Sequence, residues 1–277
     1  MKQTRFLKMH GLGNDFVIVF LNQELLITKN LVKKIADRKK GIGCDLVVFL
    51  NEDKETLSDL RVEFFNADGT SAELCGNALR CIGKYFFENS LKENIVVETK
   101  AGLIDIEKNK NKISVSMGIP KFKWQDIPLS HNVDTKDLGI KLEYLIGGFA
   151  VNIGNPHVVF FVDQFLKKKF VDESKKIQKE SIFPQGININ VVKVISKNKI
   201  SIMTYERGVG LTDACGSGAC ASVVVSNKLN LCNNKVNVSL IGGNLDIEIL
   251  ENNQVHMIGD AEHVFEGKIE LEKFNGK

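Results

Sequence analysis

The chain has 277 residues, of which 43% are hydrophobic and 26% charged, and its formal net charge is +3. A net charge this small argues weakly against nucleic acid or a membrane surface as the main partner, because both favour a concentrated basic face. No run of residues approaches the ~18 apolar positions of a membrane-spanning helix, and the N-terminal residues are too polar for a signal peptide. We therefore expect a cytoplasmic protein with a sizeable hydrophobic core.

The six cysteines show no C-x-x-C spacing, so neither a zinc ribbon nor a thioredoxin-like motif is indicated, and we expect no metal. A cytoplasmic location keeps thiols reduced, which argues against structural disulfides. Four of the six fit the pattern of small buried apolar residues, and two lie in glycine-rich turns. The four are Cys44, Cys81, Cys220 and Cys232.

The first half of the chain alternates short apolar runs with glycine-rich turns, which predicts strands around a few helices. Asn30 is expected to cap the first helix, and the second helix is apolar on most sides, so it should be buried. In order, we predict a polar turn at 10–15, a strand at 16–20, helices at 31–38 and 76–88, and strands at 45–50, 60–65, 95–99, 103–107 and 113–117.

A polar, irregular stretch at 121–142 separates the halves, and we place a domain boundary there. Lys167, Lys168 and Lys169 form the densest basic run, which is typical of a solvated surface. The second half is predicted to contain strands at 144–153, 158–162, 187–190, 200–205, 236–240, 245–250, 255–258 and 264–271, a turn at 154–157, and helices at 174–179 and 219–225.

One pattern occurs in both halves: a strand, a glycine-rich turn, a Cys-Gly pair and then an apolar helix. The first copy places Cys75 at the helix start, and the second places Cys215 there. A helix start attracts anions and stabilises a thiolate. The fold class is therefore mixed α/β (α+β), with two similar halves that each present a reactive sulfur beside a carboxylate-binding turn.

Five stretches together resemble the diaminopimelate epimerase family, in the family's order and across nearly the whole chain. They are residues 9–16 (MHGLGNDF), 65–69 (FNADG) with 74–77 (LCGN), 154–157 (GNPH), 205–210 (YERGVG) and 214–220 (ACGSGAC). The resemblance implies two pseudo-symmetric domains, each with many short strands around a buried central helix, and an active site in the cleft between them. The implied domains are 1–118, with the tail 262–277 returning to it, and 119–261.

The resemblance also implies a cofactor-independent isomerase of lysine biosynthesis and peptidoglycan precursor supply, which interconverts LL- and meso-diaminopimelate. It places the catalytic thiols at Cys75 and Cys215 and their pKa-tuning neighbours at His157 and Glu206. A homodimer is expected. The implied substrate contacts are Asn14, Asn66, Gly76, Asn77, Asn155, Asn188, Glu206, Arg207, Gly216 and Ser217.

Three positions depart from the family pattern. Leu46 stands where the family usually has a glutamine, so one polar substrate contact is missing or replaced. Leu211 stands where many members have glutamate. Asp213 adds a carboxylate two residues before Cys215, which raises the pKa of that thiol if the two groups are close.

The residue inventory fits inversion of a carbon next to a carboxylate. Such a reaction needs a proton removed from one face and another delivered to the opposite face, which two opposed thiols can do. Glu206 suits an ammonium group and Arg207 a second carboxylate, so a diamino-dicarboxylate substrate is expected. Taken singly, the turn at Asn66 is an ordinary turn and His157 an ordinary structural histidine.

Three alternatives remain open at this point. A proline- or hydroxyproline-type racemase of the same fold is kept open by Leu46. A redox-active dithiol protein would use the same pair of cysteines. A non-catalytic binding protein would bind the ligand without exchange of its α-proton.

Overall fold

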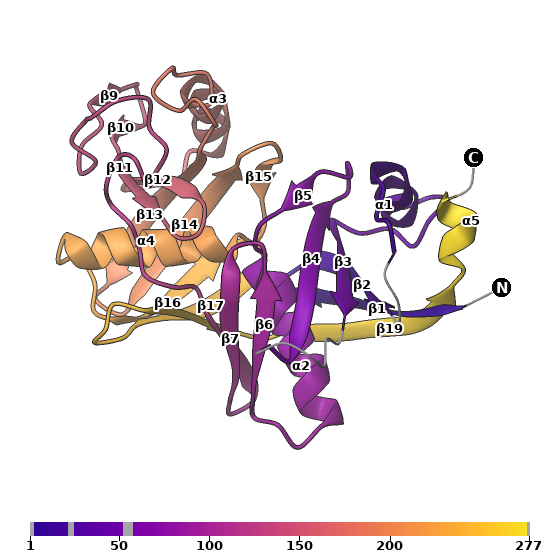
Figure 1. Cartoon of the computed structure of the whole chain (residues 1–277). Coiled ribbons are helices and arrows are strands. Elements are labelled where there is room, and N and C mark those ends of the chain that lie inside the picture. The colour runs from indigo at the N-terminus through magenta and orange to yellow at the C-terminus, as the bar shows by residue number, and fades with distance from the viewer. Residues whose placement is uncertain (1–2, 22–24, 52–57, 276–277) are drawn as a thin grey trace. The chain divides into compact units, whose positions relative to one another are not determined.

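The computed structural model describes residues 3–21, 25–51 and 58–275, and the last two residues of the predicted C-terminal tail lie outside these ranges. The chain divides into two compact units, Met1–Val115 with Gly259–Lys277, and Ser116–Ile258. Both units are rich in strands (Figure 1). The domain limits expected from the sequence, 1–118 with 262–277 and 119–261, remain a prediction.

The first unit is a mainly antiparallel set of strands with helix α2 packed against β1 and β7. Strand β2 runs parallel to β3, β3 antiparallel to β4, β4 parallel to β6, and β6 antiparallel to β7. The elements are β1 (Thr4–Gly11), β2 (Asn14–Leu21), α1 (Lys29–Ala36), β3 (Leu46–Asn51), β4 (Leu60–Asn66), β5 (Ser71–Ala72), α2 (Gly76–Asn89), β6 (Asn94–Thr99), β7 (Gly102–Asn109), β8 (Lys112–Ser116), β19 (Glu262–Ile269) and α5 (Leu271–Asn275).

The second unit repeats this order of pairing. Strand β12 runs parallel to β13, β13 antiparallel to β14, β14 parallel to β16, and β16 antiparallel to β17. Helix α4 takes the place of α2. The elements are β9 (Ile140–Lys141), β10 (Ile146–Gly147), β11 (Phe149–Asn152), β12 (Pro156–Phe161), α3 (Lys167–Ile177), β13 (Asn188–Ser196), β14 (Lys199–Glu206), β15 (Gly210–Thr212), α4 (Gly216–Lys228), β16 (Lys235–Leu240), β17 (Gly243–Ile249) and β18 (Val255–Gly259).

The expectation of a mixed α/β fold with two similar halves is therefore confirmed. Helix α4 is buried on all sides from Gly218 to Ser226, and ten of its residues are buried, two serines among them. Helix α2 packs closely on its strands: a Cβ added at Gly83 would lie 2.6 Å from Ile106 Cγ2 and 2.8 Å from Ile113 Cγ2. The absence of a side chain at Gly83 lets the helix sit directly on β7 and β8.

Several local predictions were wrong. Thr28, not Asn30, caps α1, because its hydroxyl accepts a hydrogen bond from Leu31 N at 3.2 Å. Strand β1 was not anticipated; it pairs with β2 across a two-residue turn, Leu12 and Gly13, both at positive φ. Helix α3 begins seven residues earlier than the predicted 174.

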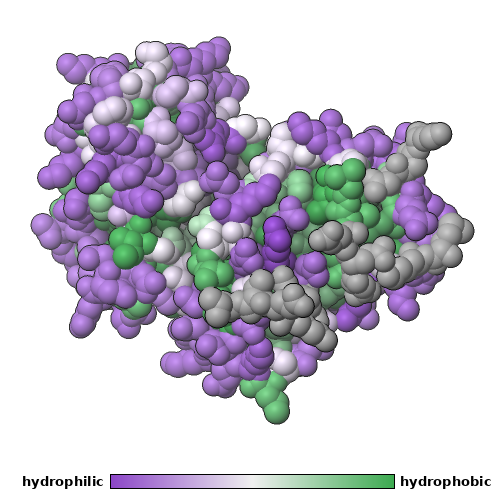
Figure 2. Space-filling model, in the orientation of Figure 1, coloured by the Kyte–Doolittle hydropathy of each residue, from purple (hydrophilic) through white to green (hydrophobic). Residues whose placement is uncertain are grey.

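The strand predicted at 144–153 is divided into β10 and β11 around Gly147 and Gly148, which both have positive φ. His157 lies in β12 rather than in the preceding turn. The basic run at 167–169 is exposed, as expected. Hydrophilic residues cover most of the face seen in Figure 2. Among the residues described, no helix is long and apolar enough to cross a membrane.

Candidate active site

The two cysteines of the repeated pattern occupy the same structural position in each unit. Cys75 is the N-cap of α2, with φ −138° and ψ 100°, and Cys215 is the N-cap of α4, with φ −111° and ψ 107°. Each follows a short strand that pairs antiparallel with the long strand before it, β5 with β4 and β15 with β14. The fold therefore carries both sulfurs at helix starts, where free backbone N–H groups favour bound anions.

Cys215 is buried, and its sulfur accepts a hydrogen bond from Gly218 N at 3.3 Å. The hydroxyl of Ser217 lies 3.5 Å from the same sulfur. Burial, followed by the Glu206 carboxylate, raises the pKa of the Cys215 thiol well above its ordinary value, although Ser217 and Gly218 oppose the change. At Cys215, burial and the Glu206 carboxylate therefore outweigh the donors at the helix start, which were expected to stabilise the thiolate.

The carboxylate that raises the pKa of Cys215 belongs to Glu206, at the end of β14. Its Oε1 accepts a hydrogen bond from the Thr212 hydroxyl at 2.5 Å, which fixes the carboxylate beside the turn. Asp213, which was expected to act in this way, is exposed. Leu211 pairs with Tyr205 in the same hairpin and packs against the hydrophobic core of the second unit.

His157 is fully buried behind the Cys215 turn. Its Nε2 lies 2.8 Å from Asn155 Oδ1 and 3.1 Å from Ser217 Oγ, and its Nδ1 lies 3.1 Å from Asn190 Nδ2. Burial, followed by the Arg207 guanidinium, lowers the pKa of His157 to about 3. The ring is therefore neutral at physiological pH.

Asn188 and Arg207 also meet in the second unit, since Asn188 Oδ1 accepts a hydrogen bond from the backbone N–H of Arg207 at 3.0 Å. The Arg207 side chain is exposed and donates to the Gln185 carbonyl at 2.9 Å. An exposed guanidinium is available to pair with a carboxylate. The structure thus brings Asn155, His157, Ser217 and Cys215 into one hydrogen-bonded cluster, with Asn188 and Arg207 as a bonded pair.

In the first unit, Asn77 Nδ2 donates to Asn14 Oδ1 at 3.3 Å, and Asn14 Nδ2 donates to Asp45 Oδ2 at 3.1 Å. Arg80, which is fully buried, donates to Asn77 Oδ1 at 2.8 Å. Two expected substrate contacts are therefore linked beside the helix start that carries Cys75.

Asn66 is bonded to Thr70 within its own turn, at 2.9 Å between Nδ2 and Oγ1. Leu46 pairs with Asn66 across β3 and β4. The glycines that follow the two cysteines, Gly76 and Gly216, are each the first residue of a helix, and both are buried.

The four remaining cysteines are buried, as expected. Burial raises the pKa of Cys44 and Cys81 to about 12 and that of Cys232 to about 11. These thiols are protonated and unreactive at neutral pH. No group of three or more His, Cys, Asp or Glu side chains that could hold a metal ion occurs within 3–21, 25–51 and 58–275.

A network of charged side chains lies next to Asn14 and includes its hydrogen-bond partner, Asp45. Asp15 accepts hydrogen bonds from Lys8 and, through both carboxylate oxygens, from Arg38 at 2.7 and 2.9 Å. Burial raises the pKa of Asp15, but the hydrogen bonds from Arg38 and then Lys8 outweigh it and hold the pKa well below its usual range. Arg38 also pairs with Asp45, the partner of Asn14.

This network predicts a loss of stability in acid. The pKa of Asp15 is lower in the folded than in the unfolded chain, so its stabilisation is complete above the unfolded value of about 4 and falls as the pH decreases below it. We expect Arg38→Gln to reduce the difference in unfolding free energy between pH 6 and pH 3, measured by urea denaturation. Arg61→Gln, on the exposed side of β4, is the control. An unchanged pH dependence in Arg38→Gln would contradict the assignment.

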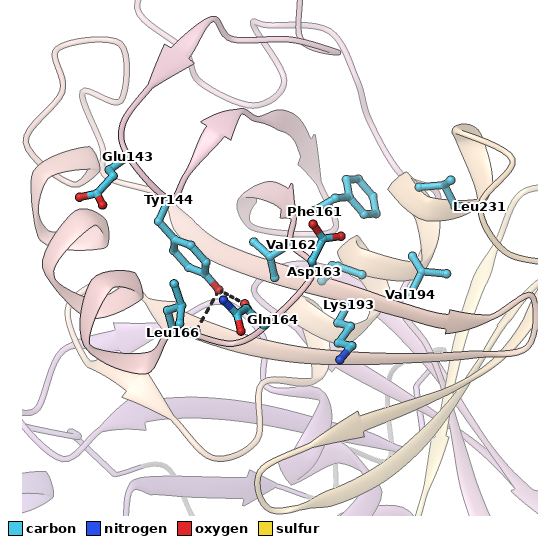
Figure 3. Close-up of a pocket in the computed structure, with 11 residues that line it drawn as sticks. Glu143, Tyr144, Phe161, Val162, Asp163, Gln164, Leu166, Lys193, Val194 and Leu231 are labelled. Atoms are coloured by element: carbon cyan, nitrogen blue, oxygen red, sulfur yellow. Dashed lines mark hydrogen bonds between the residues drawn. The ribbon is translucent and has the colours of Figure 1, made fainter.

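The second unit also has an open surface hollow, whose lining includes none of the expected site residues. Figure 3 shows Tyr144 on one side of the hollow, beside Gln164 and Leu166. Its hydroxyl donates to the Gln164 carbonyl at 2.8 Å and accepts from Leu166 N at 3.2 Å. The hollow is lined by Glu143, Tyr144, Phe161, Val162, Asp163, Gln164, Leu166, Val192, Lys193, Val194 and Leu231.

Sequence reasoning missed Asn190 and Thr204, which bond to each other at 2.9 Å behind His157. The signal for Asn190 was present, because asparagine at 188 and again at 190 places two amides on one face of a buried strand. Thr204 gave no signal, since threonine is common in strands.

Solved structures with low sequence identity to this chain share its fold. A hydroxyproline epimerase from Agrobacterium vitis matches with a TM-score of 0.70 over 96% of this chain and 92% of its own, at 12% identity. A probable proline racemase from Agrobacterium radiobacter matches with a TM-score of 0.72 over 98% and 94%, at 14% identity. The fold is thus the strand-rich α/β fold with two repeated halves that these proteins share.

Sequence comparison resolves the family within that fold. The family model described as diaminopimelate epimerase matches residues 6–123 and 149–264. Diaminopimelate epimerases from Rhizorhabdus wittichii and Methanocaldococcus jannaschii are 39% and 40% identical, over 98% and 95% of this chain and 97% and 98% of their own lengths. The chain belongs to the diaminopimelate epimerase family.

Proposed function

We propose that this protein interconverts LL- and meso-diaminopimelate without a cofactor, using Cys75 and Cys215 as the two proton carriers. The observation that carries the proposal is the matched pair of N-cap cysteines in a chain of this family. Each sulfur serves one face of the reacting carbon. The active site would then lie in a cleft between the predicted domains, where both sulfurs reach the same carbon.

The reaction begins when a thiolate removes the α-proton and the opposite thiol delivers another. The raised pKa of Cys215 favours its protonated form. In the direction that uses this form, Cys215 is the proton donor and Cys75 is the thiolate base. After inversion the roles are exchanged, and the product's α-proton has come from Cys215.

The two helix starts supply backbone N–H groups, with those of Gly76, Asn77, Gly216 and Ser217 as the proposed contacts for the reacting carboxylate. Negative charge grows on this carboxylate as the carbanion forms, so donors fixed in advance lower the barrier. His157 and Glu206 tune the sulfurs. By stabilising this negative charge, the N–H groups provide part of the stabilisation that an electron-accepting cofactor would supply.

The distal end of the substrate is proposed to bind through an ion pair and amides. Arg207 holds the second carboxylate, and Glu206 faces an ammonium group. Asn14, Asn66, Asn155 and Asn188 complete the polar contacts. We further propose that the protein acts in the cytoplasm, as a homodimer, in the supply of lysine and peptidoglycan precursors.

The test is α-proton exchange in heavy water, followed by NMR with LL-diaminopimelate and, in a parallel sample, with L-proline. We expect deuterium to enter diaminopimelate as the meso isomer appears, and proline to remain unlabelled. Exchange with proline alone would replace the proposed substrate by that of a proline-type racemase. Folded, reduced protein that exchanges neither substrate would contradict the proposed reaction.

A further inference from the structure

Three buried polar side chains stand in a row behind the Cys215 turn. Thr204, Asn190 and His157 come from the neighbouring strands β14, β13 and β12 and are 2%, 0% and 0% exposed. Asn190 is paired directly with Thr204 in the register of β13 and β14. Buried polar groups at this depth need hydrogen-bond partners of the correct kind, so the direction of each bond is constrained.

Asn190 determines the direction in which the hydrogen bonds of this row are donated. Its Nδ2 lies 3.1 Å from His157 Nδ1 and 3.2 Å from the Val158 carbonyl oxygen, and its Oδ1 lies 2.9 Å from Thr204 Oγ1. The Val158 carbonyl can only accept, so the amide nitrogen must face it. The other amide hydrogen then points to His157 Nδ1, and Oδ1 accepts from the Thr204 hydroxyl.

We infer that Thr204 and Asn190 are positioning residues that hold His157 in the neutral tautomer with its hydrogen on Nε2. That hydrogen points to Asn155 Oδ1 at 2.8 Å and to Ser217 Oγ at 3.1 Å. Ser217 therefore accepts from His157 and directs its own hydrogen towards Cys215 Sγ, 3.5 Å away. Thr204, Asn190, His157 and Ser217 thus each donate a hydrogen bond to the next group, and the last of these bonds goes to the sulfur of Cys215.

The effect of this arrangement on catalysis rests on the proposed function, whereas the assignment of the His157 tautomer does not. Ser217 and Gly218 both lower the pKa of Cys215, against burial and Glu206. A histidine with its hydrogen on Nδ1 would turn a lone pair towards Ser217, so the serine hydroxyl would donate to the ring instead of the sulfur. The thiolate would then lose one of its two donors and become a weaker participant in proton transfer.

The test uses full-length protein with 15N-labelled histidine. The chain has five histidines. Two-bond couplings to the ring carbon-bound hydrogens distinguish the tautomers, and the His157→Gln variant assigns the His157 signals. We expect wild-type His157 to show the neutral Nε2–H pattern from pH 5 to pH 8. An Nδ1–H or doubly protonated pattern at pH 7 would overturn the inference.

Thr204→Val and Thr204→Ser form a matched pair, since the first keeps the shape and removes the hydroxyl, and the second keeps the hydroxyl. We expect an Nδ1–H population and a kcat about tenfold lower or more in Thr204→Val, with KM little changed and with wild-type behaviour in Thr204→Ser. Wild-type signals and kcat in Thr204→Val would contradict the role of Thr204.

Asn190→Asp provides the opposite case, because a carboxylate can only accept and so calls for a hydrogen on Nδ1. We expect this variant to convert His157 to the Nδ1–H or doubly protonated form. Retention of the Nε2–H pattern there would contradict the role of Asn190. If the wild-type protein showed the Nε2–H pattern but exchanged no α-proton, the tautomer assignment would be supported and the proposed reaction would be contradicted.

Discussion

Replacing either Cys75 or Cys215 with alanine should abolish epimerisation, with kcat at least ~10³-fold lower, because each sulfur carries the proton of one face. The two variants should differ in a diagnostic way. The remaining thiolate can still exchange the α-proton of the one stereoisomer that presents it on that side. We therefore expect each variant to incorporate deuterium into a different isomer, without inversion.

The measurement is NMR in heavy water with each isomer of diaminopimelate supplied separately. Cys81→Ala and Cys220→Ala are matched controls, because both residues are fully buried in the same two helices. Both controls should retain activity. Inversion that persists in Cys75→Ala or Cys215→Ala would refute the assignment of two bases.

The second large effect is expected at Gly218, in the first turn of α4. A Cβ added there would lie 2.6 Å from Asn190 Oδ1, 2.8 Å from Thr204 Oγ1 and 3.2 Å from Cys215 Sγ. All three neighbours are buried, and Asn190 and Thr204 are hydrogen-bonded to each other, so they cannot move aside without cost. Gly218→Ala should destabilise the protein by about 1–3 kcal/mol. It should also lower kcat about tenfold or more, because it displaces the sulfur and its donor.

Thermal unfolding and the heavy-water assay on the same sample separate these two effects. Ser222→Ala, one turn further along α4, is the control, since it removes a buried hydroxyl and adds no atoms. It should leave kcat unchanged. If Gly218→Ala matched the wild type in both melting temperature and kcat, the close packing at this position would have no functional role.

Much of the fold could be predicted because the hydrophobic pattern and the glycine turns are local signals. The buried helices at 76–88 and 219–225 were found from their apolar runs, and both occur as α2 and α4. Strand β1 was missed because part of its pairing is with a strand far away in the sequence. It pairs with β2 and also with β19, more than 250 residues along the chain.

The candidate site shows the same division between local and distant information. The cysteines and asparagines could be chosen from motifs, since each lies in a recognisable turn. The resemblance implied Glu206 as a pKa-tuning neighbour, but the direction of the pKa shift at Cys215 could not be predicted, because it depends first on burial and then on the position to which hairpin β14–β15 brings Glu206. Asp213 is nearer in sequence, but its side chain is exposed.

The cap of α1 illustrates a smaller limit. Thr28 and Asn30 are both good N-cap residues, and only backbone geometry decides between them. Thr28 is extended, with φ −94° and ψ 152°, and the helix has already begun at Lys29. Two acceptable caps two residues apart cannot be distinguished from sequence alone.

The N-cap cysteines of α2 and α4 occupy matching positions, but their surroundings differ: Cys215 is buried and accepts a hydrogen bond from Gly218 N, whereas Cys75 is half-buried and makes no side-chain cap bond. The strand ends beside them differ too, with Asn66 in one repeat and Glu206 in the other. Under the proposed reaction, the two half-reactions therefore run on unequal acids. This inequality cannot bias the final mixture, because the ratio of forward to reverse kcat/KM is fixed by the equilibrium between the two isomers. It can only set which form of the free enzyme accumulates. Catalysis in either direction then includes a recovery step, the return of the two sulfurs to the protonation state that binds that substrate, and its rate sets an upper limit at high substrate concentration.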